Sequence, residues 1–113
     1  MKPAEPTRPA DALARQVELL TNQVGHWTPQ RWAAPAAAGN TARSDLVHRL
    51  VQVLANLAAD ATAEPRRGVP RLENDLVLPD QLRVVAGDLV GADPPAPVLT
   101  RATAEVAATR QAL

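Results

Sequence analysis

The sequence predicts an all-α protein, a small antiparallel four-helix bundle, and three observations point to it. Residues that favour strands are nearly absent, since the chain contains no Ile, Tyr or Phe. Ala and Leu, the strongest helix formers, are abundant. Large apolar residues recur every three or four positions in four separate segments, as they do on one face of a helix. Mostly short, proline-marked loops join these segments, which favours antiparallel packing.

The first predicted helix covers residues 8–24. Its apolar stripe consists of Leu13, Val17, Leu20 and Val24. Gly25 follows as the residue after the helix end, and His26 lies beside the negative end of the helix dipole. Residues 1–8 are rich in proline and polar side chains, so we expect a disordered tail there. Residues 9–113 then form a single domain.

A short helix is predicted directly after Thr28. Thr28 suits the N-cap position and Pro29 the first helical position. Trp27 and Trp32 then occupy the two positions of a hydrophobic staple, which fixes the angle at which a chain enters a helix. Pro35 ends this helix, because a proline disfavours helical geometry at the residue before it.

The third predicted helix, about residues 41–63, has the widest apolar stripe. Its large apolar residues are Leu46, Val47, Leu50, Val51, Val53, Leu54 and Leu57. Asn40 or Ser44 would cap it. A stripe of this width indicates a central helix, or a helix that also contacts a second subunit.

Two further helices complete the prediction. The helix at residues 79–90 starts with Pro79, after a helical turn or an extended piece at residues 72–78. Its inward residues are Leu82, Val85, Ala86 and Leu89. The last helix, at residues 97–112, has a weak apolar stripe made largely of alanine. A three-helix core with a peripheral fourth helix is therefore the alternative fold. Such a thin core also favours a homodimer, because association adds buried surface.

Composition excludes several classes of function. The chain has 12 basic and 12 acidic side chains, and a net charge of zero argues against nucleic-acid binding. The absence of cysteine excludes disulfides, zinc ribbons and thiol catalysis. Residues 1–10 lack the apolar segment of a secretion signal, and no apolar run is long enough to span a bilayer. We therefore expect a cytoplasmic protein without a membrane partner, and its single Lys among many Arg indicates a GC-rich bacterial genome.

Motifs that carry chemistry are missing from the sequence. It contains neither a glycine-rich phosphate loop nor a nucleophile elbow. Asp45 and His48 lie three residues apart on one predicted helix, but the pattern has no second copy that could complete a two-metal site. We interpret them as a surface pair, and we expect no metal, no cofactor and no catalytic residue.

The one basic cluster is formed by Arg66, Arg67 and Arg71. Arginine binds phosphates and carboxylates through two parallel hydrogen bonds, so these residues are candidate anion contacts. Three acidic residues flank the cluster and favour the alternative of a solvated loop with local ion pairs.

The predicted function is that of a small non-catalytic interaction module, which self-associates or binds another protein. The candidate interface residues are Trp27, Arg31, Trp32, Leu46 and Val53, because Trp and Arg dominate binding hot spots and the stripe after residue 45 is wide. The alternative is a ligand-binding bundle or small enzyme with a pocket near Trp27, Trp32, His26 and His48. Convergence of the two histidines would favour that alternative.

Overall fold

The computed structural model describes residues 8–37 and 39–113, and it confirms an all-α bundle. The four long helices are α1 (Pro9–Val24), α3 (Arg43–Ala61), α4 (Leu78–Gly91) and α5 (Ala96–Ala112). The predicted short helix after Thr28 is present as α2 (Pro29–Ala33), and a 3-10 turn, η1 (Asp75–Val77), precedes α4. The predicted tail lies outside the described residues except for Arg8, the N-cap of α1, and it stays a prediction.

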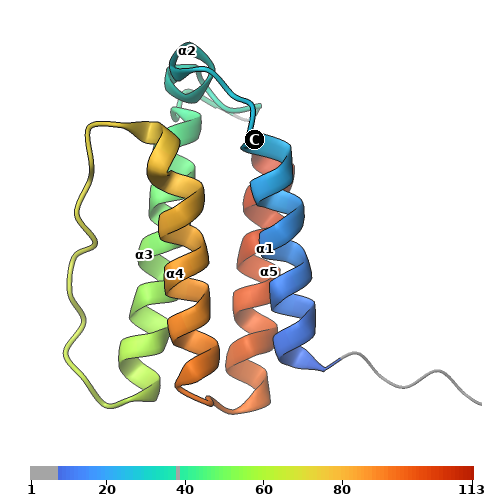
Figure 1. Ribbon diagram of the computed structural model, residues 1–113, viewed down its shortest axis with the longest axis vertical. Coiled ribbons are helices and arrows are strands. Elements are labelled where there is room, and N and C mark those ends of the chain that lie inside the picture. The colour runs from blue at the N-terminus through green and yellow to red at the C-terminus, as the bar shows by residue number, and fades with distance from the viewer. Residues whose placement is uncertain (1–7, 38) are drawn as a thin grey trace, which may run out of the picture.

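The long helices stand upright side by side (Figure 1), and each packs against two others. α3 packs on α4 and α1 packs on α5, and the two pairs meet through α1 against α4 and α3 against α5. The last helix is therefore an integral member of the bundle. Its Leu99, Ala102 and Val106 are buried against the shared core, which rules out the three-helix alternative.

Helix direction differs between the pairs. α1 and α5 run one way and α3 and α4 the other, so α1/α4 and α3/α5 are antiparallel whereas α3/α4 and α1/α5 are parallel (Figure 1). The cause is the connector, residues 62–74, which returns along α3 before α4 begins. Its 13 residues can extend over about 40 Å, more than the roughly 28 Å length of α3.

The core is built from the predicted apolar stripes. The residues with no exposed surface are Leu13, Leu20, Trp32, Val47, Val51, Leu54, Leu82, Leu89, Ala102 and Val106. At one end of the bundle α2 and both tryptophans cover the core, and Trp27 and Trp32 belong to the same buried cluster as the helix stripes. The extra width of the α3 stripe is used inside the bundle, because α3 contacts both α4 and α5.

Helix ends show where local signals were correct and where they were wrong. Thr28 caps α2 as predicted, since its Oγ1 accepts a hydrogen bond from the backbone N–H of Arg31 at 3.2 Å. Neither Asn40 nor Ser44 caps α3; its N-cap is Ala42, without a side-chain hydrogen bond. Gly25 is not left-handed but has a φ of −63°. A Cβ at Gly25 would lie 2.9 Å from the carbonyl oxygen of Thr21, so close backbone approach explains the glycine.

Candidate functional site

The two tryptophans form a compact pair beside α2. Their ring centroids lie 5.1 Å apart with an interplanar angle of 69°, an edge-to-face contact. Trp32 is fully buried and Trp27 is 5% exposed. The staple predicted from the sequence is thus present, and it closes one end of the core. Little indole surface remains for a partner, so a recognition role for this pair stays a prediction.

Two arginines lie close to the ring of Trp27. The guanidinium carbon of Arg31 lies 4.9 Å from the centroid of the Trp27 ring, and that of Arg43 lies 5.6 Å away. Arg43 also donates hydrogen bonds to the carbonyl oxygens of Leu113 and Arg31, at 3.3 and 3.4 Å. Arg31 is exposed and sits at the surface of this corner. These stacked cations hold the first turn of α3, α2 and the chain end together.

The two histidines have separate environments. His26 is exposed in the turn between α1 and α2. The Nε2 atom of His48 lies 3.1 Å from the carbonyl oxygen of Val69 in the connector. None of the three cavities described by the structure is lined by either histidine or by a tryptophan. A pocket at His26, His48, Trp27 and Trp32 therefore stays a prediction without geometric support.

Leu46 and Val53 lie on one flank of α3. Both are half-buried, and neither belongs to the core cluster or to the apolar residues packed against it. Their positions are compatible with the predicted interface. The exposed area there is nevertheless smaller than on α4, as described below.

The three arginines of the basic cluster are divided among different partners. Arg66 makes a two-pronged ion pair with Asp60, with N–O distances of 2.9 and 2.6 Å. Arg71 lies 3.3 Å from a carboxylate oxygen of Asp45 and 3.2 Å from one of Asp75. Of the three, Arg67 is the one whose side chain lines a cavity. The cluster therefore functions in large part as a set of local ion pairs that hold the connector to α3.

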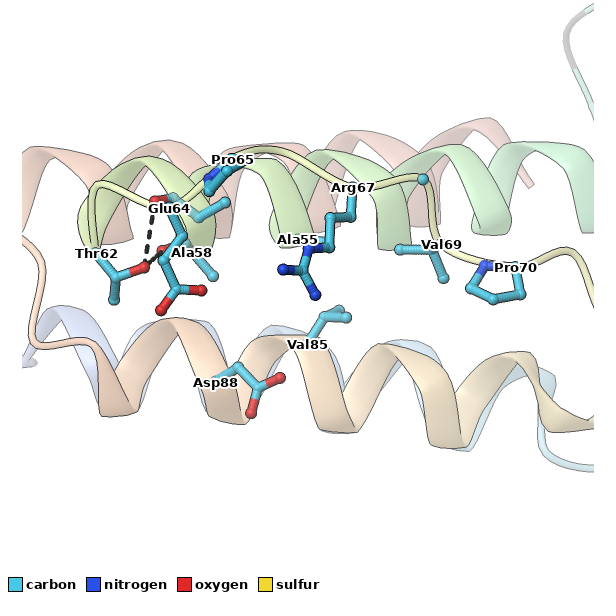
Figure 2. Close-up of a pocket in the computed structure, with 12 residues that line it drawn as sticks. Ala55, Ala58, Thr62, Glu64, Pro65, Arg67, Val69, Pro70, Val85 and Asp88 are labelled. Atoms are coloured by element: carbon cyan, nitrogen blue, oxygen red, sulfur yellow. Dashed lines mark hydrogen bonds between the residues drawn. The ribbon is translucent and has the colours of Figure 1, made fainter.

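The connector encloses a cavity of about 400 Å³ against α3 and α4. Figure 2 shows the Arg67 guanidinium reaching from the connector toward Val85 on α4, above a floor that includes Ala55 and Ala58. The carboxylates of Glu64 and Asp88 lie at one end of the same cavity. The cavity thus combines apolar walls with charges of both signs.

A larger groove, of about 660 Å³, lies between α1 and α4. We call it the α1/α4 groove; it is lined on one side by Ala10, Asp11, Ala14 and Glu18 and on the other by Arg83, Gly87 and Val90. A Cβ added at Gly87 would meet no atom within 4 Å, which shows how open the α4 side is. Small side chains in the groove would let another helix approach closely.

Exposed large apolar side chains are concentrated in one part of the chain. In residues 8–37 and 39–113 they are Leu72 (47% exposed), Leu76 (48%), Val84 (62%) and Val90 (39%). All four belong to the connector, η1 or α4. Val84 also borders a shallow apolar hollow of about 310 Å³ that includes Val69 and Val77. The exposed apolar residues therefore lie on α4 and in the segment before it, and η1, which holds Leu76, contacts α2 beside the tryptophan corner.

The sequence interpretation missed this surface, although a signal for it exists. In α4 the inward positions are Leu82, Ala86 and Leu89. Val84 and Val90 fall outside that stripe, in positions where a solvent-facing helix usually has polar residues. Counting the apolar residues left over after the inward stripe was assigned would have identified α4 as a candidate interface.

Comparison with known proteins adds no relationship: no family model, no curated protein and no solved structure matches this chain. Among the described helices, none combines the length and the apolar character needed to cross a membrane. The described residues also contain no group of three or more His, Asp or Glu side chains arranged to hold a metal ion.

Proposed function

We propose that this protein is a non-catalytic interaction module that associates with another polypeptide through the α1/α4 groove and the adjoining surface of α4. The observation that carries the proposal is that, among the described residues, the exposed large apolar side chains all lie between residues 72 and 90. Val90 lines the groove itself, and Val84 borders the separate hollow at Val69 and Val77. Apolar side chains beside a concave surface are typical of binding sites.

The shape of the groove supports a helical occupant. Two antiparallel helices form its walls, and Ala14 and Gly87 lie on opposite sides with little side-chain volume between them. A third helix can lie in such a groove with its apolar side chains against Val90 and its polar side chains near Glu18 and Arg83. This placement differs from the interface expected at the tryptophans.

Source and compartment remain proposals that rest on composition. The high Arg and Ala content with a single Lys favours a GC-rich bacterial source, and we propose the cytoplasm as the compartment. Fractionation of cells that express the protein would test the compartment directly.

The test is site-specific photo-crosslinking in expressing cells. A photoreactive residue is placed at position 87 in the groove, at position 53 on the α3 flank, and at exposed Arg101 on α5 as the control. We expect a discrete adduct from position 87, mapped to one residue of one protein, and none from position 101. Adducts from position 53 alone would move the interface to the α3 flank. No adduct from any position would contradict the proposal.

A companion variant, Gly87→Glu, fills the groove without disturbing the fold. Open space surrounds Gly87, and glycine is less favourable in a helix interior than glutamate by roughly 0.5–1 kcal/mol. The variant should therefore be at least as stable as the parent protein while it loses its partner. Arg101→Glu, with the same new side chain on α5, is the control.

A ligand-binding role is the second candidate, and the connector cavity favours it. Arg67 faces that cavity together with Glu64 and Asp88, so a small zwitterionic molecule could be bound by charges of both signs. Native mass spectrometry of the purified protein tests this idea. A reproducible added mass that disappears in Arg67→Ala would support it, and the bare 12.0 kDa chain or its multiples would oppose it.

A further inference from the structure

We infer that the occupant of the α1/α4 groove is a second copy of this chain, related to the first by a two-fold axis along the groove. The inference rests on the proposed function and adds the identity and orientation of the partner. Its basis is the distribution of charge on the two sides of the groove.

The two walls of the groove have opposite charge. The α1 wall bears Asp11 and Glu18, whereas the α4 wall bears Arg83. Arg83 has a neighbour in its own chain, since its Nη1 lies 3.0 Å from Asp80 Oδ1. The side chains of that pair are 56% and 78% exposed, and such surface pairs hold their geometry weakly. Arg83 can thus turn toward a partner.

Glu18 and Arg83 lie at similar distances from the end of the bundle that the start of α1 and the end of α4 share. α1 begins at the end of the bundle where α4 finishes (Figure 1). Glu18 is about 13 Å along from the start of α1, and Arg83 is about 12 Å from the end of α4, at 1.5 Å per residue. By the same reasoning Ala14 is level with Gly87. Two pairs of groove residues, Glu18 with Arg83 and Ala14 with Gly87, therefore lie opposite each other across the groove.

A two-fold axis parallel to the helices exchanges the two walls while it preserves these heights. It places α1 of one copy opposite α4 of the other, so that Glu18 meets the partner's Arg83 twice in one dimer. Ala14 of each copy then faces Gly87 of the other, where small residues allow the helices to approach within about 8–10 Å. The result is an intermolecular arrangement of four helices in which the two grooves face each other, with Val90 of both copies near one end.

A groove that binds an unrelated helix has no need of this symmetry. Complementary charges at equal height on opposite walls are what a self-complementary surface requires, because each residue must meet its counterpart. The same argument predicts that the association is electrostatically specific and that two singly altered chains can complement each other.

The experiment uses the full chain and charge reversals at the two positions. Sedimentation equilibrium is measured up to high-micromolar concentration for the parent protein, for Glu18→Arg, for Arg83→Glu, and for a one-to-one mixture of the two variants. We expect the parent protein to be a dimer and each variant alone to dissociate about tenfold more readily or worse, because like charges then face each other. The mixture should recover the parent affinity, since the arginine introduced at position 18 of one chain meets the glutamate introduced at position 83 of the other only across the dimer.

Controls keep the outcomes separate. Circular dichroism establishes that each variant folds, and Arg101→Glu is a charge reversal outside the groove that should leave the dimer intact. A parent protein that stays monomeric, or two weakened variants that fail to complement, would overturn the inference. If the photoreactive residue at position 87 then marks a different protein, the proposed function stands and self-pairing is wrong. If the photoreactive residue at position 87 forms no adduct, both the proposed function and the self-pairing are contradicted.

Discussion

Gln52 on α3 pairs with the backbone of Val69 in the connector. The Gln52 Oε1 atom accepts a hydrogen bond from the Val69 N–H at 2.7 Å, while its Nε2 donates to the carbonyl oxygen of Arg67 at 3.0 Å. One side chain thus satisfies both a donor and an acceptor of a segment that has no regular secondary structure. His48 adds a contact to the Val69 carbonyl oxygen. These bonds hold the connector along α3.

Replacing Gln52 with Ala should loosen the connector. The change leaves the Val69 N–H and the Arg67 carbonyl without their protein partner, and the part-exposed position lets water replace some of the lost bonding. We expect a loss of about 1–2 kcal/mol in the free energy of unfolding. Urea denaturation measures it, and hydrogen exchange at Val69 should accelerate. Gln111→Ala, at an exposed position of α5, is the control, and equal unfolding midpoints would contradict the prediction.

Trp32 should be the residue of the tryptophan pair on which stability depends most. It is fully buried, and its Nε1 has no hydrogen-bond partner among the described residues. Trp32→Ala should cost about 3–5 kcal/mol by leaving a cavity. Trp32→Phe keeps most of the ring and removes the unpaired N–H, so a smaller loss is expected. Trp27 then reports unfolding by fluorescence as the single tryptophan. Equal losses of unfolding free energy for Trp32→Ala and Trp32→Phe would contradict this account.

The Asp60–Arg66 pair should make a small contribution to the pH dependence of stability. The Arg66 hydrogen bond, supported by its positive charge, holds the pKa of the Asp60 carboxyl below its usual value. A lowered pKa in the folded state means stabilisation that is present above about pH 4 and lost as the pH falls through the lowered value. NMR titration of the Asp60 carboxyl measures this shift directly.

Arg66→Gln should raise the pKa of Asp60 toward the ordinary aspartate value, because it removes the charged donor. Arg83→Gln, which changes a different surface pair, should leave the Asp60 titration as it was. If the pKa of Asp60 is the same in Arg66→Gln as in the parent protein, the Asp60–Arg66 pair does not persist in solution.

Val53→Glu separates the two candidate interfaces. Val53 is half-buried on the α3 flank and lies outside the core cluster, so the variant should fold with a stability change within about 1 kcal/mol. If association uses the α1/α4 groove, Val53→Glu should remain associated, whereas Gly87→Glu should not. Sedimentation equilibrium of the two variants shows which of them still associates. A folded but dissociated Val53→Glu would restore the interface predicted with Leu46, and an unfolded one would place Val53 in the core.

Local sequence signals accounted for most of the helices. The stripe Leu13, Val17, Leu20 and Val24 is buried as predicted. Thr28 and Pro29 start α2 because a cap and a fixed backbone angle act within one helical turn. The missed cap at Ser44 has a tertiary cause: Ala42 pairs with Pro35, and the Arg43 N–H donates to the carbonyl oxygen of Ala34 at 3.0 Å. The helix therefore starts at Arg43, and Ser44 lies within its first turn.

The sequence by itself determined the fold class, the helix positions and the inward faces, because helix propensity and the burial of apolar stripes depend on neighbours within a few residues. The tertiary structure decided the direction of α4, the path of residues 62–74 and the division of the arginine cluster. These depend on partners far apart in sequence: Arg71 meets Asp45, 26 residues earlier, and Val69 meets Gln52, 17 residues earlier. Periodicity has no information about such pairs. The exposed surface of α4 and the groove between α1 and α4 likewise depend on how these two helices pack.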